Sequence, residues 1–321
     1  MSAGSQRIGA AIGDPNGIGA EIVVKAAVAL GARGASRPLL IGEQFIVDSV
    51  CDTLNLDERA RASFEVHSVG ALKRDDWHPG QVTAAAGAAT VAYAREAVRL
   101  QRAGAIGVVA AAPHSETAVN AAGIPFSGYA GLLADLTGTP RDHVFLMLEA
   151  KGLRVVHCTL HESVRTALAR ITPELVEAAA HAARQTLPQL GFAQPRLCVI
   201  GINPHAGEGG LFGDEDERIT RPAVQAMRDK GWAVEGPVGA DLALSERKYD
   251  GYVAMLHDQG HVAIKMLSPK GSSAISAGLP FLFSSVGHGA AFDLAGKGVA
   301  DASAMVDTFA LLAKAAQSSM R

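Results

Sequence analysis

The sequence predicts an α/β fold with two lobes. Short apolar runs alternate along the chain with longer alanine-rich segments of helical periodicity, and strands separated by helices in this way favour mostly parallel sheets. The chain has 321 residues, which exceeds the usual size of one hydrophobic core and indicates two lobes. Hydrophobic residues make up 48% of the chain and charged residues 19%, so a large core can form.

The expected elements follow from these apolar runs. In the first part of the chain we expect strands at residues 8–12, 37–41 and 106–111 and helices at 18–30 and 84–102. Further along we expect strands at 144–148, 153–159, 196–202 and 252–256 and helices at 172–187, 219–230 and 303–316. Thr172-Pro173-Glu174 is a typical helix start. No repeat of fixed period or low-complexity segment marks a linker.

The net charge and the cysteine content indicate which partners and which cellular compartment to expect. The formal net charge is −3, so nucleic acid and anionic membranes are poor default partners. Cys51, Cys158 and Cys198 form no CxxC pair, which favours a reduced compartment over a disulfide framework. We find no secretory signal pattern and no run of about 18 apolar residues. We therefore expect a cytoplasmic protein.

Three apolar strands each lead to a histidine, namely His161, His205 and His257. Ligands of open α/β sheets bind outside the carboxyl ends of the strands, where histidines distant in sequence can converge. Imidazoles suit zinc, and a three-nitrogen site leaves a position open for substrate. The alternative is that each histidine is a cap or a turn residue. His157 and His261 compete for the same role, and His261 is a candidate to support a ligand rather than to be one.

Two glycine-rich loops are candidates to hold a cofactor. The first, Asp14–Gly19, lies between a strand and a helix, although it is not GxGxxG and a plain turn is the alternative. The second is Gly287–Gly298, and a helix beginning near Ala290 would aim its N-terminal N–H groups at an anion such as a pyrophosphate. The residues expected to contact the cofactor are Asp14, Gly17, Ile18, Gly19, Gly287, His288, Gly289 and Asp293.

Three charged residues are candidates for proton transfer. Asp258 adjoins a proposed ligand, and Asp258 or Asp241 would orient a histidine or act as a base. Lys265 follows an apolar run and would bind a carboxylate or supply a proton. The alternatives are a surface ion pair for Asp241 and a solvated side chain for Lys265.

Together these motifs resemble the 4-hydroxythreonine-4-phosphate dehydrogenase (PdxA) family over nearly the whole chain. The segments that carry the resemblance are GDPNGIG at 13–19, AGIPFSG at 122–128, NPHAGEGG at 203–210, HDQG at 257–260 and the His288 loop. The resemblance implies an isocitrate/isopropylmalate dehydrogenase-like fold with the active site in the cleft between the lobes. It implies lobes of residues 1–125 plus 270–321 (cofactor loops) and 126–269 (metal ligands and dimerisation). It also implies NAD or NADP and a homodimer in which both subunits supply the three metal-binding histidines.

The chain departs from the family pattern at positions where the phosphate-binding members of the family contact their substrate. Tyr129-Ala130 replaces a His-Thr pair, Glu116 replaces a lysine, and Ala274 and Phe283 replace an asparagine and an arginine that contact the substrate, whereas Lys265 remains. Losing these groups removes the means to hold a phosphate dianion. Tyr129 and Phe283 would suit a flat, less charged molecule.

The segments FSGY at 126–129, TLHESVR at 159–165 and MLHDQGH at 255–261 are more similar to a branch of the family, the terephthalate cis-dihydrodiol dehydrogenases. That branch oxidises 1,2-dihydroxycyclohexa-3,5-diene-1,4-dicarboxylate with NAD(P) to protocatechuate and carbon dioxide, in terephthalate catabolism. One divalent ion is expected, with zinc favoured by the imidazoles. The alternatives are a 4-phosphohydroxy-L-threonine dehydrogenase of pyridoxal phosphate biosynthesis, a paralogue on another hydroxy acid phosphate, and a non-catalytic metal- or ligand-binding protein.

Overall fold

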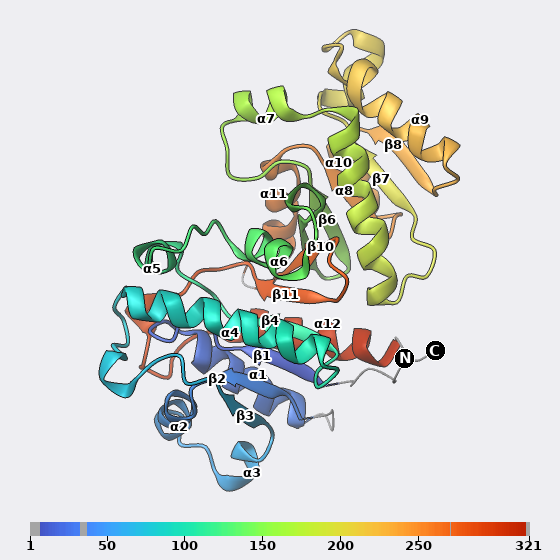
Figure 1. Cartoon of the computed structure of the whole chain (residues 1–321). Helices are drawn as coiled ribbons and strands as arrows, with labels where there is room; N and C mark the ends of the chain where they lie inside the picture. The colour runs from blue at the N-terminus through green and yellow to red at the C-terminus, as the bar shows by residue number, and fades with distance from the viewer. Residues whose placement is uncertain (1–6, 33–36, 270, 319–321) are drawn as a thin grey trace. The chain divides into compact units, whose positions relative to one another are not determined.

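A computed structural model of the protein describes residues 7–32, 37–269 and 271–318. The chain divides into two compact units, residues 1–138 with 281–321 and residues 139–280. The α/β prediction is confirmed, since helices alternate with sheet strands in both units (Figure 1). None of the helices in the described ranges is long and apolar enough to span a bilayer.

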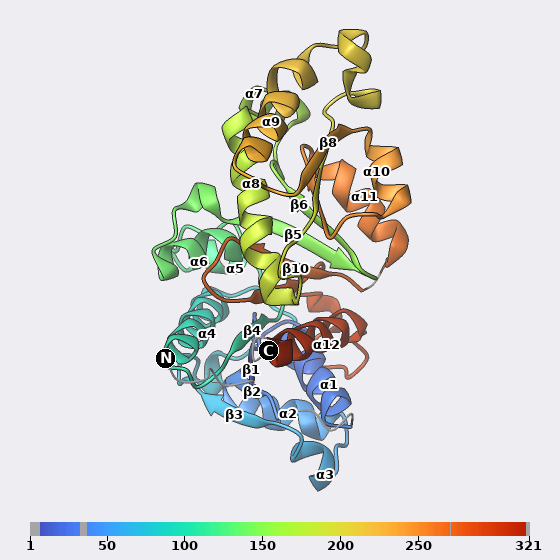
Figure 2. The same ribbon diagram turned by 90° about the vertical axis from the view of Figure 1, so that its right-hand side faces the viewer.

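Unit 1 is a parallel sheet with the strand order β3-β2-β1-β4-β11. Helix α4 packs on one face, and α1 and α12 pack together on the other (Figure 2). Its strands are β1 (Ile8–Ala11), β2 (Leu39–Gly42), β3 (Glu65–Ser68), β4 (Val108–Ala111) and β11 (Phe283–Val286). Its helices are α1 (Gly19–Gly31), α2 (Gln44–Thr53), α3 (Glu58–Arg61), α4 (Ala84–Arg102), α5 (Glu116–Ala121), α6 (Tyr129–Thr137) and α12 (Ser303–Ser318).

Unit 2 is a mixed sheet with the order β10-β5-β6-β9-β7-β8. β6, β9, β7 and β8 are parallel, whereas β5 is antiparallel to both β6 and β10. Its strands are β5 (Phe145–Ala150), β6 (Leu153–His157), β7 (Leu197–Ile200), β8 (Val234–Val238), β9 (Gly251–Ala254) and β10 (Ser273–Ala277). Its helices are α7 (Val164–Arg170), α8 (Pro173–Thr186), α9 (Arg221–Asp229), α10 (Ala240–Glu246) and α11 (His257–Leu267).

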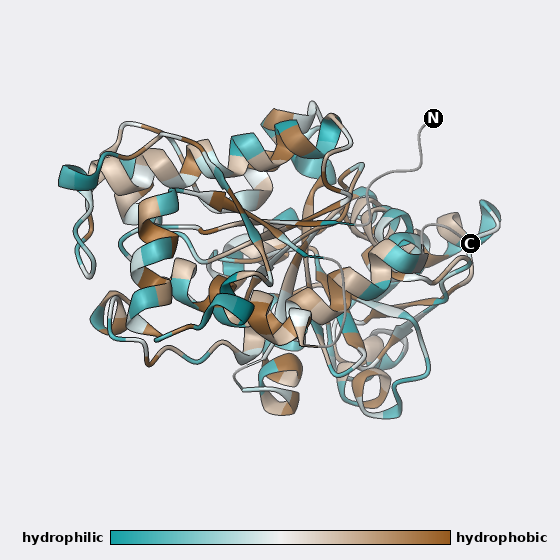
Figure 3. Ribbon diagram, turned by 90° about the horizontal axis from the view of Figure 1, so that it is seen from below, coloured by the Kyte–Doolittle hydropathy of each residue, from teal (hydrophilic) through white to brown (hydrophobic). Residues whose placement is uncertain are grey.

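Amphipathic helices close both faces of the second sheet. Helix α8 buries Val176, Ala179, Ala180 and Ala183, the spacing of one helical face. Helices α8 and α9 lie on one face, and α10 and α11 on the other (Figure 2). Figure 3 shows brown and teal stretches alternating along the helices, as this packing requires. The arrangement leaves the carboxyl ends of β6, β9 and β7 free to present side chains.

The unit boundaries differ from those expected at residues 125/126 and 269/270. Helix α6 belongs to unit 1 because the Tyr129 hydroxyl donates to the Ala112 carbonyl (3.0 Å) and the ring packs on Phe283. Strand β10 belongs to unit 2 because it pairs with β5 along its whole length. The first unit therefore gains α6 and the second gains β10.

Candidate metal and cofactor sites

Two of the three predicted metal ligands lie together at the carboxyl edge of the second sheet. His161 follows β6 and His257 begins α11 directly after β9, and β6 and β9 are paired neighbours. The two imidazole centroids are 5.6 Å apart with an interplanar angle of 49°. A cavity of about 430 Å³ beside them is lined by Thr159–Glu162, Val164, Ala167 and Leu256–Asp258. The sheet register thus brings together two histidines that lie far apart in sequence.

Helix α11 fixes the orientation of His257. Gln259 anchors the helix start, because its Oε1 accepts from the backbone N–H of Met255 and Leu256 and its Nε2 donates to the Gly201 carbonyl. Nδ1 of His257 lies 2.7 Å from Oδ1 of Asp258, whose side chain is 87% exposed. A carboxylate at Nδ1 favours the tautomer with its lone pair on Nε2, the usual arrangement for a metal-binding histidine.

His205 lies on a left-handed turn rather than at a strand end. β7 ends at Ile200, and His205 to Gly210 all have positive φ, with His205 at 51°, Ala206 at 52° and Glu208 at 45°. Such backbone costs about 1–2 kcal/mol for each residue other than glycine, so the rest of the unit must hold it. Nδ1 of His205 lies 3.3 Å from Oε2 of Glu208, which repeats the carboxylate–imidazole pairing of His257.

Asp216 is the buried anchor of this turn. Its Oδ1 accepts from the Ile202 N–H (2.8 Å) and the Thr220 hydroxyl (2.6 Å), and its Oδ2 accepts from the Asn203 N–H (2.9 Å). Asp216 has no exposed surface. Buried charge-assisted bonds of this kind are the strongest hydrogen bonds available, so they can offset the strain at His205.

His161 and His257 are the right distance apart for two ligands of one metal ion. No group of three or more histidine, cysteine or acidic residues within the described ranges is arranged to hold an ion. Two imidazoles whose nitrogens lie about 2.0–2.1 Å from one tetrahedral ion have centroids roughly 5 Å apart, close to the His161–His257 separation. The distance between the two rings is thus compatible with a shared ion, and the described residues of the chain bring no third ligand to them.

His157 and His261, the competing candidates, do not line the cavity beside His161 and His257. His157 is 1% exposed, and burial lowers its pKa to about 3. Its Nδ1 lies 3.3 Å from the Leu146 carbonyl. His261 stacks on His257 with centroids 3.6 Å apart and an angle of 13°. Desolvation lowers the pKa of His261 to about 4, so at neutral pH it packs on His257 as an uncharged ring.

Of the predicted acid–base residues, Asp258 contacts His257, whereas Lys265 and Asp241 lie elsewhere in unit 2. Lys265 lies about two helical turns after His257 in α11, donates to Ser272 Oγ (3.4 Å), and has its pKa lowered by partial burial. Asp241 is exposed in the first turn of α10. A Cβ built on Gly239 would lie 3.1 Å from Asp241 Oδ1 and 3.5 Å from the His205 Cα, so Asp241 adjoins the His205 turn. Ala274 is partly buried on β10.

The two glycine-rich loops of unit 1 contact each other. The Ile18 N–H donates to the Ala290 carbonyl (2.9 Å), and a Cβ on Gly17 would lie 2.8 Å from the same oxygen. The expected helix near Ala290 was wrong: Ala291 has a left-handed φ of 42°, and only a 3₁₀ turn at Phe292–Leu294 follows. The second loop therefore offers no long helix dipole to a pyrophosphate.

Asp14 is a buried part of the first loop. It has no exposed surface, its Oδ1 accepts from the Asn16 N–H (2.9 Å), and its Oδ2 has no hydrogen-bond partner among the described residues. Burial raises its pKa to about 6. The neighbouring predicted contacts, Gly287, His288, Gly289 and Asp293, are partly or fully exposed.

The raised pKa of Asp14 makes unit 1 less stable at neutral pH. The folded state binds this proton more tightly than the unfolded chain, so the stabilisation is complete below pH 3.8 and is lost as the pH rises through about 6. The difference is about 3 kcal/mol. Asp14→Asn should remove this dependence and raise the free energy of unfolding at pH 7.5. The free energy of unfolding, measured by urea titration at pH 4 and pH 7.5, checks this. Asp48→Asn, which changes an exposed carboxylate, is the control. If the free energy of unfolding depends on pH equally in wild type and in Asp14→Asn, the prediction is wrong.

The predicted substrate residues Tyr129 and Phe283 lie in the core of unit 1. Phe283 has no exposed surface, Tyr129 has 5%, and their centroids are 5.3 Å apart. Ala130 is partly buried beside them. Sequence reasoning missed His114, whose ring packs edge-on against Tyr129 at 4.6 Å and Phe126 at 4.9 Å. Burial lowers the pKa of His114 to about 4, so the aromatic cluster is uncharged at neutral pH.

Comparison with known proteins places the chain in a family of dehydrogenases. A Comamonas sp 1,2-dihydroxy-3,5-cyclohexadiene-1,4-dicarboxylate dehydrogenase is 48% identical over 307 residues, which cover 96% of this chain and 97% of the relative. The structure of a terephthalate 1,2-cis-dihydrodiol dehydrogenase from Burkholderia xenovorans LB400 is 43% identical, with a TM-score of 0.71 and coverage of 96% and 97%. A 4-hydroxythreonine-4-phosphate dehydrogenase structure from Klebsiella pneumoniae is 36% identical, with a TM-score of 0.86 and coverage of 99% and 100%.

The relatives support an oxidoreductase, as the sequence predicted. The model of the family described as pyridoxal phosphate biosynthetic protein PdxA matches residues 32–312. The match includes the three histidines and the second glycine-rich loop. The chain therefore belongs to the PdxA family.

Proposed function

We propose that this protein is a metal-dependent, NAD(P)-linked dehydrogenase that converts 1,2-dihydroxycyclohexa-3,5-diene-1,4-dicarboxylate to protocatechuate, carbon dioxide and NAD(P)H. The observation that carries the proposal is the His161–His257 pair, held 5.6 Å apart beside an open cavity at the carboxyl ends of β6 and β9. The 48% identity to the Comamonas dehydrogenase supports this substrate.

The candidate acid–base residues have distinct roles in this reaction, and one of them, Asp258, lines the cavity. A bound zinc or other divalent ion would lower the pKa of a ligated hydroxyl, and a bound nicotinamide would accept the hydride. Asp258 orients His257 through Nδ1, which leaves Asp241 as the base that takes the hydroxyl proton. Lys265 binds the carboxylate that leaves as carbon dioxide, because its partly buried ammonium strengthens the attraction.

A homodimer completes the metal site in this proposal. His161 and His257 supply two imidazoles, and the third comes from a second copy. Exposed apolar side chains flank the candidate ligands, with Leu211 (73%) and Phe212 (48%) after His205 and Val262 (57%) and Met266 (79%) on α11. Apolar surface around polar ligands is typical of a protein interface. Covering it with a second copy would also exclude water from the ion.

The residues that replace phosphate-binding groups argue against the 4-phosphohydroxythreonine alternative. Phe283 is fully buried against Tyr129 where the family has an arginine, and Ala274 has no polar group. Glu116 is exposed at the start of α5 and adds a negative charge where the family has a lysine. A phosphate dianion therefore loses its positively charged partners, whereas a planar diene dicarboxylate still has Lys265.

The test is a paired assay of nicotinamide reduction with the two substrates. We expect the dihydrodiol dicarboxylate to give NADH and protocatechuate in equal amounts, and 4-phosphohydroxythreonine to react at least about 10³-fold less efficiently, since lost polar contacts discriminate this strongly. Rapid NADH production from the phosphate ester would favour the alternative. Metal binding with no reduction of nicotinamide by either substrate would indicate a non-catalytic protein.

A further inference from the structure

A further cavity lies in unit 2, at the edge of the sheet opposite the candidate metal site. It has a volume of about 470 Å³, within the range of about 300–1,000 Å³ for small-molecule pockets, and is lined by Arg184, Pro188, Ala193, Gln194, Pro195, Gly231, Trp232 and Ala233. Pro195 and Ala233 come just before β7 and β8, whereas His161 and His257 follow β6 and β9. These four strands are parallel. The cavity, which we call the Arg184 cavity, therefore lies at their amino ends and is separate from the metal site.

Trp232 and two prolines give the Arg184 cavity a flat, rigid apolar surface. Trp232 is partly buried, and its backbone N–H donates to the carbonyl of Met227 in α9 (3.1 Å). The rings of Pro188 and Pro195 lock the backbone φ at these two positions. An aromatic ring packs favourably on an indole, either offset or edge-on. The surface therefore suits a planar apolar group.

The positive charge of the cavity comes from Arg184. Its Cζ lies 5.1 Å from the centroid of the Trp232 ring, which is within the range of cation–π contacts. A guanidinium that stacks through its face keeps its N–H donors in the plane, directed outward. None of the carboxylates in the described ranges lies within ion-pair distance of Arg184. The guanidinium is thus oriented by Trp232 and available to an anion.

The charge in the cavity matches a single carboxylate better than a phosphate dianion. Arg184 is the one charged residue among the lining residues described. Lys230, which precedes the lining residue Gly231, is already ion-paired with Glu177. A dianion would therefore meet one positive group, whereas a carboxylate accepts two parallel N–H bonds from one guanidinium. The Gln194 amide, which makes no hydrogen bond to other described residues, can serve a further polar group on the ligand.

From these contacts we propose that the Arg184 cavity binds a small aromatic carboxylate. The carboxylate pairs with the Arg184 guanidinium, and the aromatic ring packs on Trp232 and the two prolines. The product of the proposed reaction belongs to this chemical class, so the protein has a second place for such a molecule, away from the candidate metal site. The proposal does not rest on the proposed function, because binding is measured without nicotinamide or substrate.

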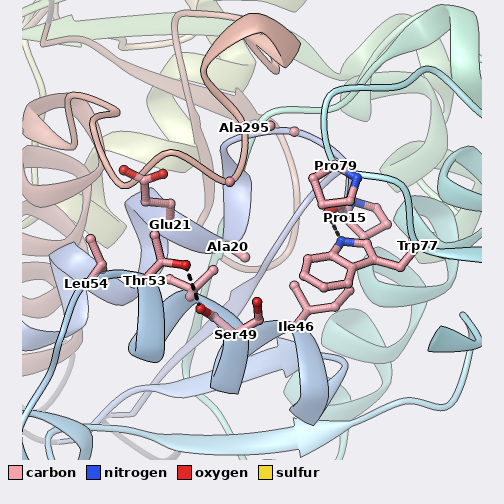
Figure 4. A pocket seen from close by; sticks show the side chains of 13 residues that line it. Pro15, Ala20, Glu21, Ile46, Ser49, Thr53, Leu54, Trp77, Pro79 and Ala295 are labelled. Atoms are coloured by element: carbon pink, nitrogen blue, oxygen red, sulfur yellow. Dashed lines mark hydrogen bonds between the residues drawn. The ribbon is translucent and has the colours of Figure 1, made fainter.

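Two single-tryptophan proteins locate the ligand. The chain has two tryptophans, so full-length Trp77→Phe reports on Trp232 in the Arg184 cavity, and Trp232→Phe reports on Trp77. Trp77 lines a different cavity, in unit 1, whose one charged residue among those described is Glu21 (Figure 4). We expect benzoate to change Trp232 fluorescence with saturation, at a Kd of about 1 mM or below. Trp77 fluorescence should show no saturable change, because a carboxylate repels an anion.

Three further probes test the charge and the shape of the ligand. Benzamide keeps the aromatic ring without the negative charge, cyclohexanecarboxylate keeps the charge on a ring that is not planar, and inorganic phosphate is an anion without a ring. We expect each of them to bind at least about fivefold more weakly than benzoate in the Trp77→Phe protein. Equal affinity of benzoate and any of the three, or no saturable response of Trp232 to benzoate, would overturn the proposal.

Two matched pairs of variants, made in the Trp77→Phe protein, test the residues of the cavity. Arg184→Gln removes the cation and should weaken benzoate about tenfold or more, whereas Arg95→Gln, exposed on α4 of unit 1, should not. Ala193→Phe fills the cavity and should weaken benzoate similarly, whereas Gln185→Phe, exposed on α8 outside the cavity, should not. Equal affinities for benzoate within either pair would contradict the proposal.

Discussion

His257→Ala is expected to abolish turnover and to remove the bound metal while leaving the fold intact. His257 supplies one of the two neighbouring imidazoles, and its Nδ1 is already committed to Asp258. Losing a ligand should cost more than the 10–100-fold that loss of a partner supporting a ligand costs, so we expect turnover to fall by about 10³-fold or more. Steady-state assay and metal content by plasma emission measure the two effects, and His161→Ala and His205→Ala should behave alike.

The control is His181→Ala in the same unit, where the ring stacks on Trp232 with centroids 5.7 Å apart and an angle of 27°. It removes an imidazole that is not a candidate ligand, so metal content and turnover should stay close to wild type. Unchanged metal content in His257→Ala, with far-ultraviolet circular dichroism like that of wild type, would show that the ligand assignment is wrong.

Asp216→Ala is expected to destabilise unit 2 and to weaken metal binding together. The substitution leaves the Ile202 and Asn203 N–H groups and the Thr220 hydroxyl without their buried acceptor. Each buried unsatisfied group costs about 1–3 kcal/mol, so the free energy of unfolding should fall by about 3–5 kcal/mol. The turn that carries His205 loses its anchor, so the affinity for Zn²⁺ should fall as well.

Thr220→Val keeps the Asp216 carboxylate and removes one of its three hydrogen-bond donors. We therefore expect smaller losses of the free energy of unfolding and of Zn²⁺ affinity, in a protein that still folds. Asp214→Ala, two residues away and exposed, should leave the urea midpoint and the Zn²⁺ affinity near wild type. A Thr220→Val variant with lower stability but unchanged Zn²⁺ affinity would separate Asp216 from the metal site and contradict this account.

The alternation of strands and helices could be predicted because it depends on local apolar periodicity. Helix α11 could not be predicted in this way, because its first four residues, His-Asp-Gln-Gly, include Gly260, and glycine disfavours a helix interior. Gly260 is required there by tertiary packing: a Cβ would lie 2.2 Å from His157 Nε2. The helix predicted near Ala290 failed for a related reason, because the contact of Ala290 with Ile18 holds the next residue in a left-handed conformation.

The candidate site was partly accessible from the sequence. The rule that ligands follow the carboxyl ends of strands identified His161 and His257, and the structure brings them together. The same rule applied to β4 would have identified His114, which follows Val108–Ala111 after two residues. The rule did not give the backbone conformation at His205, which lies five residues after the end of β7 on a left-handed turn. Gly207, Gly209 and Gly210 were the sequence signal for that turn, whereas no pattern indicated its anchor, Asp216.

The most direct test of the metal site is X-ray absorption spectroscopy of the zinc-loaded, full-length protein. The account predicts three imidazole nitrogens at about 2.0–2.1 Å from the ion, with one fewer in each of the His161→Ala, His205→Ala and His257→Ala variants. A spectrum of wild-type protein with a single imidazole, or with a coordination shell that none of the three variants alters, would contradict it.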